Sequence, residues 1–243
     1  MSGMLAAIVA LVVPPRCAAC RAPARHAADV VCAACRRALP WLAAPRCPRC
    51  ALPLPCGRRC PARDAAFDSA WAVVAYEGVA REAMHALKFA AARPLAQVMA
   101  AQIAADRRAA RLAERRPTLV AVPAHPRRRR VRGFDAAELI AAALARRTGL
   151  PLRRALRRGR APSHQLGATR EARRDAANLH FAARGRAPQR VVLVDDVHTT
   201  GATLDACARV LRAAGAEHVE AVTWARTLDD RFVDSDRTEA YHR

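Results

Sequence analysis

The sequence has very little lysine, and its positive charge is almost entirely arginine. Lys88 is the one lysine in a chain of 243 residues with a formal net charge of +21. An alanine-rich composition with arginine in place of lysine is as typical of genome-wide codon bias as of selection for nucleic-acid binding. A strongly basic protein attracts phosphate groups at low salt in either case. The charge therefore permits a nucleic-acid partner without indicating one.

Aromatic residues are also scarce, which limits one mode of nucleic-acid binding. They make up 4% of the chain, and Trp41, Phe67, Trp71 and Phe134 are scattered along it. Proteins that hold single-stranded nucleic acid stack its bases on aromatic rings. The sequence therefore argues against high-affinity single-strand binding by the isolated chain.

The sequence contains no hydrophobic run long enough for a membrane span. Its apolar segment at residues 4–13 is followed at once by Pro14 and Pro15, whereas a membrane-spanning helix needs about 20 apolar residues. A secretory signal is also not expected, because no basic residue precedes the apolar run and no small-residue cleavage site follows it before the cysteines. We expect residues 1–13 to form a short docking helix in a cytoplasmic protein.

Eight of the nine cysteines lie within residues 14–63, a proline-rich segment without helical or strand periodicity. A C-x-x-C pair brings two thiolates to one ion from a tight turn, and four thiolates complete a tetrahedral Zn²⁺ site. A disulfide framework is the alternative, but such frameworks belong to secreted chains. The segment is therefore predicted to be a compact module with two structural Zn²⁺ ions.

Sequence order suggests how the eight ligands divide between the two ions. The spacing alone does not exclude a crossed pairing of the cysteines. The first zinc site takes Cys17, Cys20, Cys32 and Cys35, and the second zinc site takes Cys47, Cys50, Cys56 and Cys60. The ninth cysteine, Cys207, falls on the apolar stripe of a predicted helix and is expected in the core.

From residue 64 onward, segments of strand length alternate with helical segments. Strands are expected at 70–76, 118–122, 191–194 and 219–225, and helices at 78–89, 93–115, 136–147, 169–177 and 202–214. Asp135 stands where the cap of the third of these helices belongs. This alternation predicts an α/β fold with a largely parallel sheet.

Two regions between these elements lack a clear pattern. The arginine-rich stretch at 125–133 is expected to be a loop, and residues 153–186 are basic and weakly patterned apart from the helix at 169–177. The polar tail at 228–243 is expected to fray.

The most informative stretch is VVLVDDVHTTGAT, at residues 191–203. A buried strand ends in Asp195 and Asp196, and a hydroxyl-rich turn then opens a helix. Backbone N–H groups at a helix N-terminus suit a phosphate, and Gly201 permits close backbone approach. Two carboxylates would repel that phosphate unless they face other groups, such as ribose hydroxyls with a magnesium ion nearby.

This stretch resembles the phosphoribosyl pyrophosphate fingerprint of type I phosphoribosyltransferases. The resemblance implies that Asp195 and Asp196 contact the ribose hydroxyls. It also implies that a loop holds the 5′-phosphate, formed by Thr199, Thr200, Gly201, Ala202 and Thr203.

Three further segments, at 85–96, 120–141 and 215–227, resemble the ComF family of competence-associated proteins. The family plan is a cysteine-rich zinc ribbon before a phosphoribosyltransferase domain, which implies a ribbon module at 14–63 and a transferase-like domain at 64–227. Where the family commonly has Asn-Gln after Arg-Gly-Phe, this chain has Asp135 and Ala136. That departure puts a substrate-holding role for these two side chains in doubt.

Two basic residues are candidates for the pyrophosphate side of the site. Lys88 ends a helical run, where its ammonium group can meet a pyrophosphate oxygen or face solvent. Arg132 adjoins Gly133 in the arginine-rich stretch. His125 and His198 receive no catalytic role.

Two functions remain open at this point. The first is an enzyme that transfers ribose 5-phosphate from phosphoribosyl pyrophosphate to an unknown acceptor, with Mg²⁺ on the leaving pyrophosphate. The second is a non-catalytic protein that keeps the ligand site and engages single-stranded DNA or a helicase partner during DNA uptake. The ComF resemblance implies the second partner class by association only.

Overall fold

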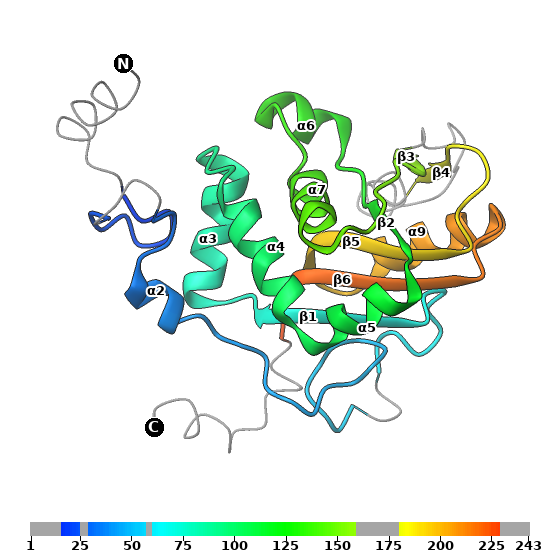
Figure 1. The fold of residues 1–243 in the computed structure, drawn as a ribbon, viewed down its shortest axis with the longest axis horizontal. Coiled ribbons are helices and arrows are strands. Elements are labelled where there is room, and N and C mark those ends of the chain that lie inside the picture. Colours follow the sequence, from blue (N-terminus) through cyan, green and yellow to red (C-terminus); the bar gives the residue numbers. More distant parts are fainter. Residues whose placement is uncertain (1–15, 25–28, 57–59, 159–179, 229–243) are drawn as a thin grey trace, which may run out of the picture.

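The computed structural model describes residues 16–24, 29–56, 60–158 and 180–228 (Figure 1). Within them, the centre of the molecule is a four-stranded sheet in the order β1-β6-β5-β2, in which every neighbouring pair is parallel. The strands are β1 (Ser69–Ala75), β2 (Thr118–Ala121), β5 (Arg190–His198) and β6 (His218–Arg226). The predicted α/β class with a parallel-sheet core is confirmed.

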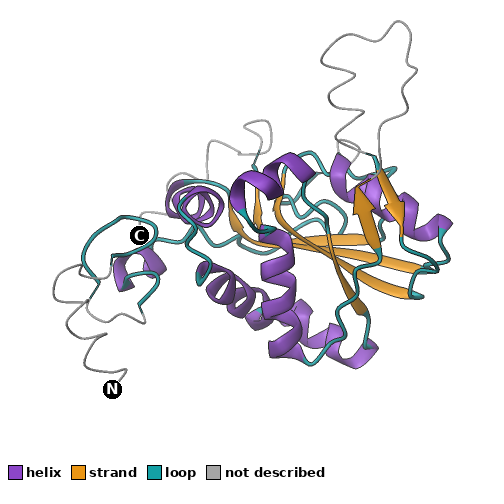
Figure 2. Ribbon diagram, turned by 90° about the horizontal axis from the view of Figure 1, so that it is seen from above, coloured by secondary structure: helices purple, strands orange, loops and turns teal. Residues whose placement is uncertain are grey.

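Helices cover both faces of this sheet (Figure 2). Leu193 and Val219 pack with Leu204 and Leu211 of α9 (Ala202–Ala213) in one buried cluster. The opposite cluster contains Val192 of β5 and the helices α3, α4 and α7. These three helices span Gly78–Phe89, Leu95–Ala105 and Ala136–Thr148. The continuous apolar run of β5 is therefore buried on both sides, as is typical of a central parallel strand.

One expected helix is in fact two. The sequence predicted a single helix at 93–115, but α4 ends at Ala105 and α5 spans Arg107–Arg115. Asp106 between them is extended, and its side chain accepts a hydrogen bond from the backbone N–H of Arg108 at 2.8 Å. The aspartate therefore caps a new helix where the apolar pattern alone suggested continuation.

The arginine-rich stretch at 125–133 was expected to be a loop, and this prediction was wrong. It contains the helix α6 (Pro126–Arg132), which begins after His125 and ends at Gly133 with φ of 73°. His125 accepts a hydrogen bond from Arg127 N, and proline occupies the first turn, where its missing N–H costs nothing. Sequence analysis also missed an antiparallel pair, β3 (Leu156–Arg158) and β4 (Phe181–Ala183).

The two groups of cysteines pack into different parts of the core. Cys17 and Cys35, the latter in the short helix α2 (Ala33–Arg37), join the cluster of α3, α4 and α7. Cys47 and Cys50 join the cluster that contains α9. As expected, Cys207 is fully buried in that second cluster.

Several expectations lie outside the described residues: the docking helix at 1–13, the helix at 169–177 and nearly all of the polar tail at 228–243. In the part of the chain that the structure describes, we find no helix of the length and apolar character that a membrane crossing requires.

Candidate functional site

The eight cysteine sulfurs of residues 14–63 gather into the two groups that sequence order predicted. Within each group of four, all sulfur atoms lie within 4.8 Å of one another. Sulfur pairs are 3.8 Å apart for Cys20 and Cys32, 3.9 Å for Cys47 and Cys60, and 4.0 Å for Cys50 and Cys56. A tetrahedral Zn²⁺ with Zn–S bonds of about 2.3 Å places its sulfurs about 3.8 Å apart.

The same distances exclude disulfides, whose sulfurs are about 2.05 Å apart, and all the cysteines are free. Burial raises the pKa of the Cys17 thiol, but backbone hydrogen bonds, first that from Cys32, outweigh it and lower the pKa to about 6. The pKa of Cys47 falls to about 7 in the same way, with the backbone of Cys50 contributing. Burial instead raises the pKa of Cys35 and Cys50, and it raises the pKa of Cys56 to about 11. The thiolate is the form that binds metal, and the fit of both groups to structural zinc rests on their sulfur positions.

The acidic pair lies inside a strand, whereas the sequence predicted that the strand ends in these two residues. β5 continues to His198, and Asp195 pairs in register with Thr223 of β6. Both carboxylates are half-buried at the carboxyl end of the sheet. Burial, followed by the charge of Asp196, raises the pKa of Asp195 well above its usual value.

The turn after β5 has the geometry that its sequence predicted. Gly201 has a φ of +88° and stands directly before the first residue of α9, a conformation that favours glycine. Thr199 and Thr200 are exposed, and Thr200 Oγ1 accepts a hydrogen bond from Ala202 N at 3.3 Å. The turn therefore presents hydroxyl groups and a helix N-terminus to solvent at the edge of the sheet.

A buried histidine, His198, packs against this turn, although we expected it to be an ordinary loop residue. His198 is the last residue of β5 and is 1% exposed. A Cβ atom added to Gly201 would lie 2.9 Å from His198 Nε2, so the ring packs directly against the glycine. Burial, with a further contribution from Arg226, lowers the pKa of His198 to about 3, which keeps its ring neutral at pH 7.

The structure brings Lys88 and Arg132 to the same corner of the molecule. Lys88 Nζ lies 2.8 Å from Asp196 Oδ2. The Arg132 guanidinium lies 4.7 Å from the centre of the Phe89 ring, and Phe89 is the neighbour of Lys88. Lys88 therefore reaches the acidic pair from the end of α3, and Arg132 of α6 lies against Phe89 at that same end of α3.

Asp135 binds backbone N–H groups. The departure from the family pattern had put a substrate-holding role for this side chain in doubt. Its carboxylate accepts hydrogen bonds from Ala124 N at 2.6 Å and from Ala137 N at 3.1 Å. It thereby caps α7, as predicted, and also fixes the segment that follows β2. Burial raises the pKa of Asp135, partly offset by the Ala124 hydrogen bond.

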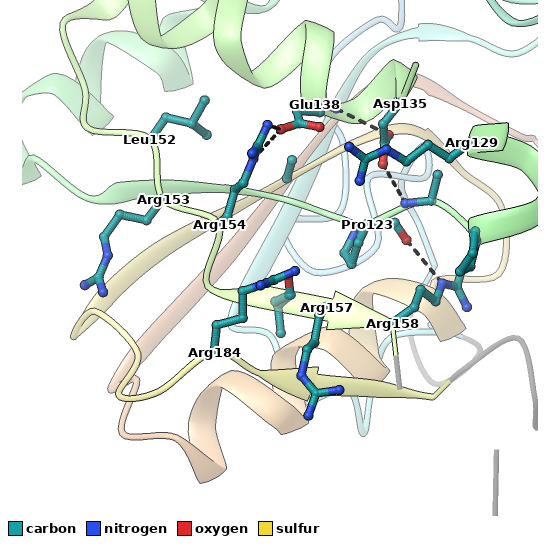
Figure 3. A pocket seen from close by; sticks show the side chains of 14 residues that line it. Pro123, Arg129, Asp135, Glu138, Leu152, Arg153, Arg154, Arg157, Arg158 and Arg184 are labelled. Carbon is teal, nitrogen blue, oxygen red and sulfur yellow. Dashed lines mark hydrogen bonds and ion pairs between the residues drawn. The ribbon is translucent and has the colours of Figure 1, made fainter. Parts of the chain in front are cut away.

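A cavity of about 330 Å³ opens beside the carboxyl end of β2 (Figure 3). Its two acidic residues are both engaged: Asp135 with backbone N–H groups, and Glu138 in an ion pair with Arg154. The cavity has six arginines on its wall, namely Arg129, Arg153, Arg154, Arg157, Arg158 and Arg184. The wall therefore has a net positive charge that suits an anionic group.

Arg158 is held by a backbone carbonyl and an aromatic ring. Its Nε donates to Pro123 O at 3.2 Å, and its guanidinium lies 4.4 Å from the centre of the Phe181 ring. Its Nη1 is buried and has no hydrogen-bond partner among the described residues. Burial lowers the pKa of the Arg158 guanidinium, and the negative charge of Asp195 is among the groups that partly offset this.

Comparison with known proteins gives two domain matches and close full-length relatives. The double zinc ribbon domain matches residues 8–63, and the phosphoribosyl transferase domain matches residues 134–238. The DNA utilization protein YhgH of Salmonella typhi is 31% identical over 231 residues, which cover 90% of this chain and 100% of that protein. The protein of that name from Escherichia coli K12 is 32% identical over 232 residues, with the same coverage.

Proposed function

Because this chain belongs to the ComF family, which joins a double zinc ribbon to a phosphoribosyltransferase domain, we propose that it binds phosphoribosyl pyrophosphate. The observation that carries the proposal is the acidic pair, Asp195 and Asp196, followed by the turn at Gly201. The carboxylates accept hydrogen bonds from the ribose hydroxyls. The N–H groups and hydroxyls from Thr199 to Thr203 hold the 5′-phosphate. The proposed domain runs over residues 64–227.

Lys88 and Arg132 are assigned to the diphosphate. Lys88 lies beside Asp196, and Arg132 lies against Phe89 at the same end of α3, which supports an approach of both cations to a diphosphate bound at the acidic pair. Asp195 and Asp196 also suit Mg²⁺, which prefers oxygen ligands from carboxylates and substrate phosphates. When bound with the diphosphate, Mg²⁺ supplies positive charge to the leaving group.

The proposed reaction transfers ribose 5-phosphate to an acceptor. The bond between ribose C1 and the diphosphate oxygen breaks, a bond from the acceptor nucleophile to C1 forms, and diphosphate leaves with the electron pair. The chain contributes positioning and charge stabilisation. The arginine-lined cavity opens at the carboxyl end of β2, the strand that pairs with β5, which supports an acceptor that carries an anionic group.

Titration calorimetry with phosphoribosyl pyrophosphate and Mg²⁺ tests the binding. We expect the Asp195→Asn/Asp196→Asn double variant to lose binding and to keep its fold. Glu82→Gln on the exposed side of α3 is the matched control. Normal binding by the double variant would refute the ribose assignment. Release of diphosphate in the presence of anionic acceptors tests the transfer.

A non-catalytic role is the second candidate. The two relatives are called DNA utilization proteins, which favours a protein that holds its ligand while it engages single-stranded DNA or a DNA-processing helicase. Magnesium-dependent binding of phosphoribosyl pyrophosphate without diphosphate release, across the same acceptors, supports this role over the enzyme.

A further inference from the structure

We propose that the second zinc site is part of the phosphate-binding site, and that Arg226 positions the phosphate loop from it. The inference rests on the proposed function for its ligand, but its structural basis is separate. It concerns Arg226, whose side chain joins Cys50, one of the four cysteines of that zinc site, to the point where β5 becomes the loop.

Arg226 is the last residue of β6 and is 3% exposed. Its Nε donates a hydrogen bond to Cys50 O at 2.9 Å. Its Nη1 donates to His198 O at 2.8 Å and also to Thr199 O. One planar, fully charged group therefore ties the backbone of a zinc ligand to the first residues of the phosphate loop.

The C-terminal end of the phosphate loop, where α9 begins, is also fixed by residues that follow the second zinc site in the chain. Ala66, a few residues beyond Cys60, donates its backbone N–H to Asp205 Oδ1 at 2.7 Å. Asp205 lies in the first turn of α9, directly after the loop. Arg212 of the same helix forms an ion pair with Asp68. The chain that leaves the second zinc site thus fixes the start of α9, while Arg226 fixes the end of β5.

The first zinc site offers an internal control. Cys17 and Cys35 pack in the core cluster that contains Met84 and Leu87 of α3. Among the hydrogen bonds of the described residues, none joins residues 16–37 to residues 198–205. Loss of zinc from the first site should therefore damage the zinc-ribbon module without a direct effect on the phosphate loop. It serves as a control for general damage.

The coupling has a physical cause. A buried guanidinium requires its acceptors, because an unpaired charge inside a protein is strongly unfavourable. If the second zinc is lost, Cys50 is no longer tied through the ion to the other three cysteines of the site, and Arg226 must move with its partners on the loop. Coupling between two binding sites is reciprocal, so bound ligand at the loop must also retain the zinc.

The first experiment compares Cys60→Ser with Cys32→Ser in the full chain. Each variant removes one ligand from one zinc site. We expect Cys60→Ser to speed amide hydrogen exchange at residues 198–203 and to weaken binding of phosphoribosyl pyrophosphate with Mg²⁺ about tenfold, within the usual range of coupling between sites. Cys32→Ser should lose the same amount of zinc with neither effect. Equal effects of the two variants, or none from Cys60→Ser, would overturn the proposal.

The second experiment leaves all eight cysteines in place. Zinc release to a chromophoric chelator is followed with and without phosphoribosyl pyrophosphate and Mg²⁺. In the wild-type chain the ligand should slow release of one of the two ions, and in Arg226→Lys it should not, although the variant retains both ions. Ammonium replaces guanidinium there and cannot span the same three carbonyl groups. Equal protection in both proteins would refute the role of Arg226.

The outcomes separate this inference from the proposed function. If the wild-type chain does not bind phosphoribosyl pyrophosphate, the proposed function fails. The amide-exchange comparison of Cys60→Ser, Arg226→Lys and Cys32→Ser still decides the coupling, because it needs no ligand. Unchanged exchange at residues 198–203 in Arg226→Lys then overturns the inference.

Discussion

Lys88 Nζ lies 2.8 Å from Asp196 Oδ2, and the two side chains are 19% and 17% exposed. This ion pair joins the end of α3 to the acidic pair of β5. Two adjacent carboxylates repel each other at the edge of a sheet, and the single lysine of the chain reduces that repulsion. The single primary ammonium side chain of the sequence therefore lies at the proposed ligand site.

Replacing Lys88 should expose that repulsion. We expect Lys88→Met to lower the free energy of unfolding at pH 7 by about 1–3 kcal/mol, the usual cost of leaving a buried polar group without its partner. Urea unfolding measures the change. The double variant Lys88→Met/Asp196→Asn should recover most of the loss, because the unpaired carboxylate is gone. An additive further loss in the double variant would contradict the pairing.

The raised pKa of Asp195 predicts how stability depends on pH. A carboxyl group with a folded-state pKa above its unfolded value stabilises the fold while it is protonated. For Asp195 that contribution is present below pH 3.8, the usual pKa of the group, and is lost as pH rises through the raised pKa of the folded state. We therefore expect Asp195→Asn, which does not titrate, to be more stable than the wild-type chain at pH 7.

Urea unfolding between pH 3.5 and 8 checks this, with Glu82→Gln as a control that should keep the wild-type slope. The Asn variant should show a smaller fall in stability with rising pH. An identical slope in both proteins would show that Asp195 keeps an ordinary pKa in the folded state.

The sequence predicted the strand-helix order and the zinc ligands because both depend on local patterns. The apolar run at 191–194 and the C-x-x-C spacings carry that information within a few residues. The break at Asp106 and the helix at Pro126–Arg132 also had local signals, a capping aspartate and a proline in the first turn. At Asp106 the apolar pattern suggested one continuous helix, and at 126–132 the run of arginines obscured the signal of the proline.

No local sequence pattern predicted the contacts of Arg226. Its partners Cys50 and His198 lie 176 and 28 residues away along the chain, and they meet only because the second zinc site packs on the face that carries α9. The same is true of Lys88 and Asp196. Pairing of side chains across a sheet edge depends on the packing of whole elements, which a single sequence does not reveal.

The metal content tests the two cysteine groups directly. We expect the purified chain to contain close to two zinc ions by elemental analysis, because each group of four sulfurs fits one tetrahedral ion. Cys32→Ser and Cys60→Ser should each reduce the content to about one ion. A wild-type chain with one ion would show that one group does not bind zinc under these conditions.

Gly201 should tolerate no side chain. Its φ of +88° disfavours any other residue, and an added Cβ would lie 2.9 Å from His198 Nε2. We expect Gly201→Ala to abolish binding of phosphoribosyl pyrophosphate and to lower the free energy of unfolding by about 1–3 kcal/mol. Gly185→Ala is the matched control, since its φ is +80° and an added Cβ meets nothing within 4 Å. Gly185→Ala should lower the free energy of unfolding only through its unfavourable backbone conformation, and it should bind phosphoribosyl pyrophosphate normally.

The last prediction separates charge from specific recognition of DNA. If the arginine excess is compositional, binding of a single strand should be weak, independent of sequence and unaffected by chelation of zinc. Affinity should fall steeply with salt, with a log–log slope of about −0.7 per phosphate neutralised. The described aromatic residues offer little for base stacking: Trp41 and Phe89 are among the few exposed large apolar side chains.

The measurement is fluorescence anisotropy of a labelled single strand at several salt concentrations, with and without chelator. Neutralising the exposed cavity arginines with Arg153→Gln/Arg157→Gln should reduce the salt slope by about 1.4, which is 0.7 for each lost phosphate contact, if the cavity wall contacts the strand. The wild-type affinity without zinc should stay within error of the value with zinc, because every arginine remains when the ions are removed. A large loss on chelation that persists at physiological salt would instead place a DNA site on the zinc module and favour the non-catalytic role.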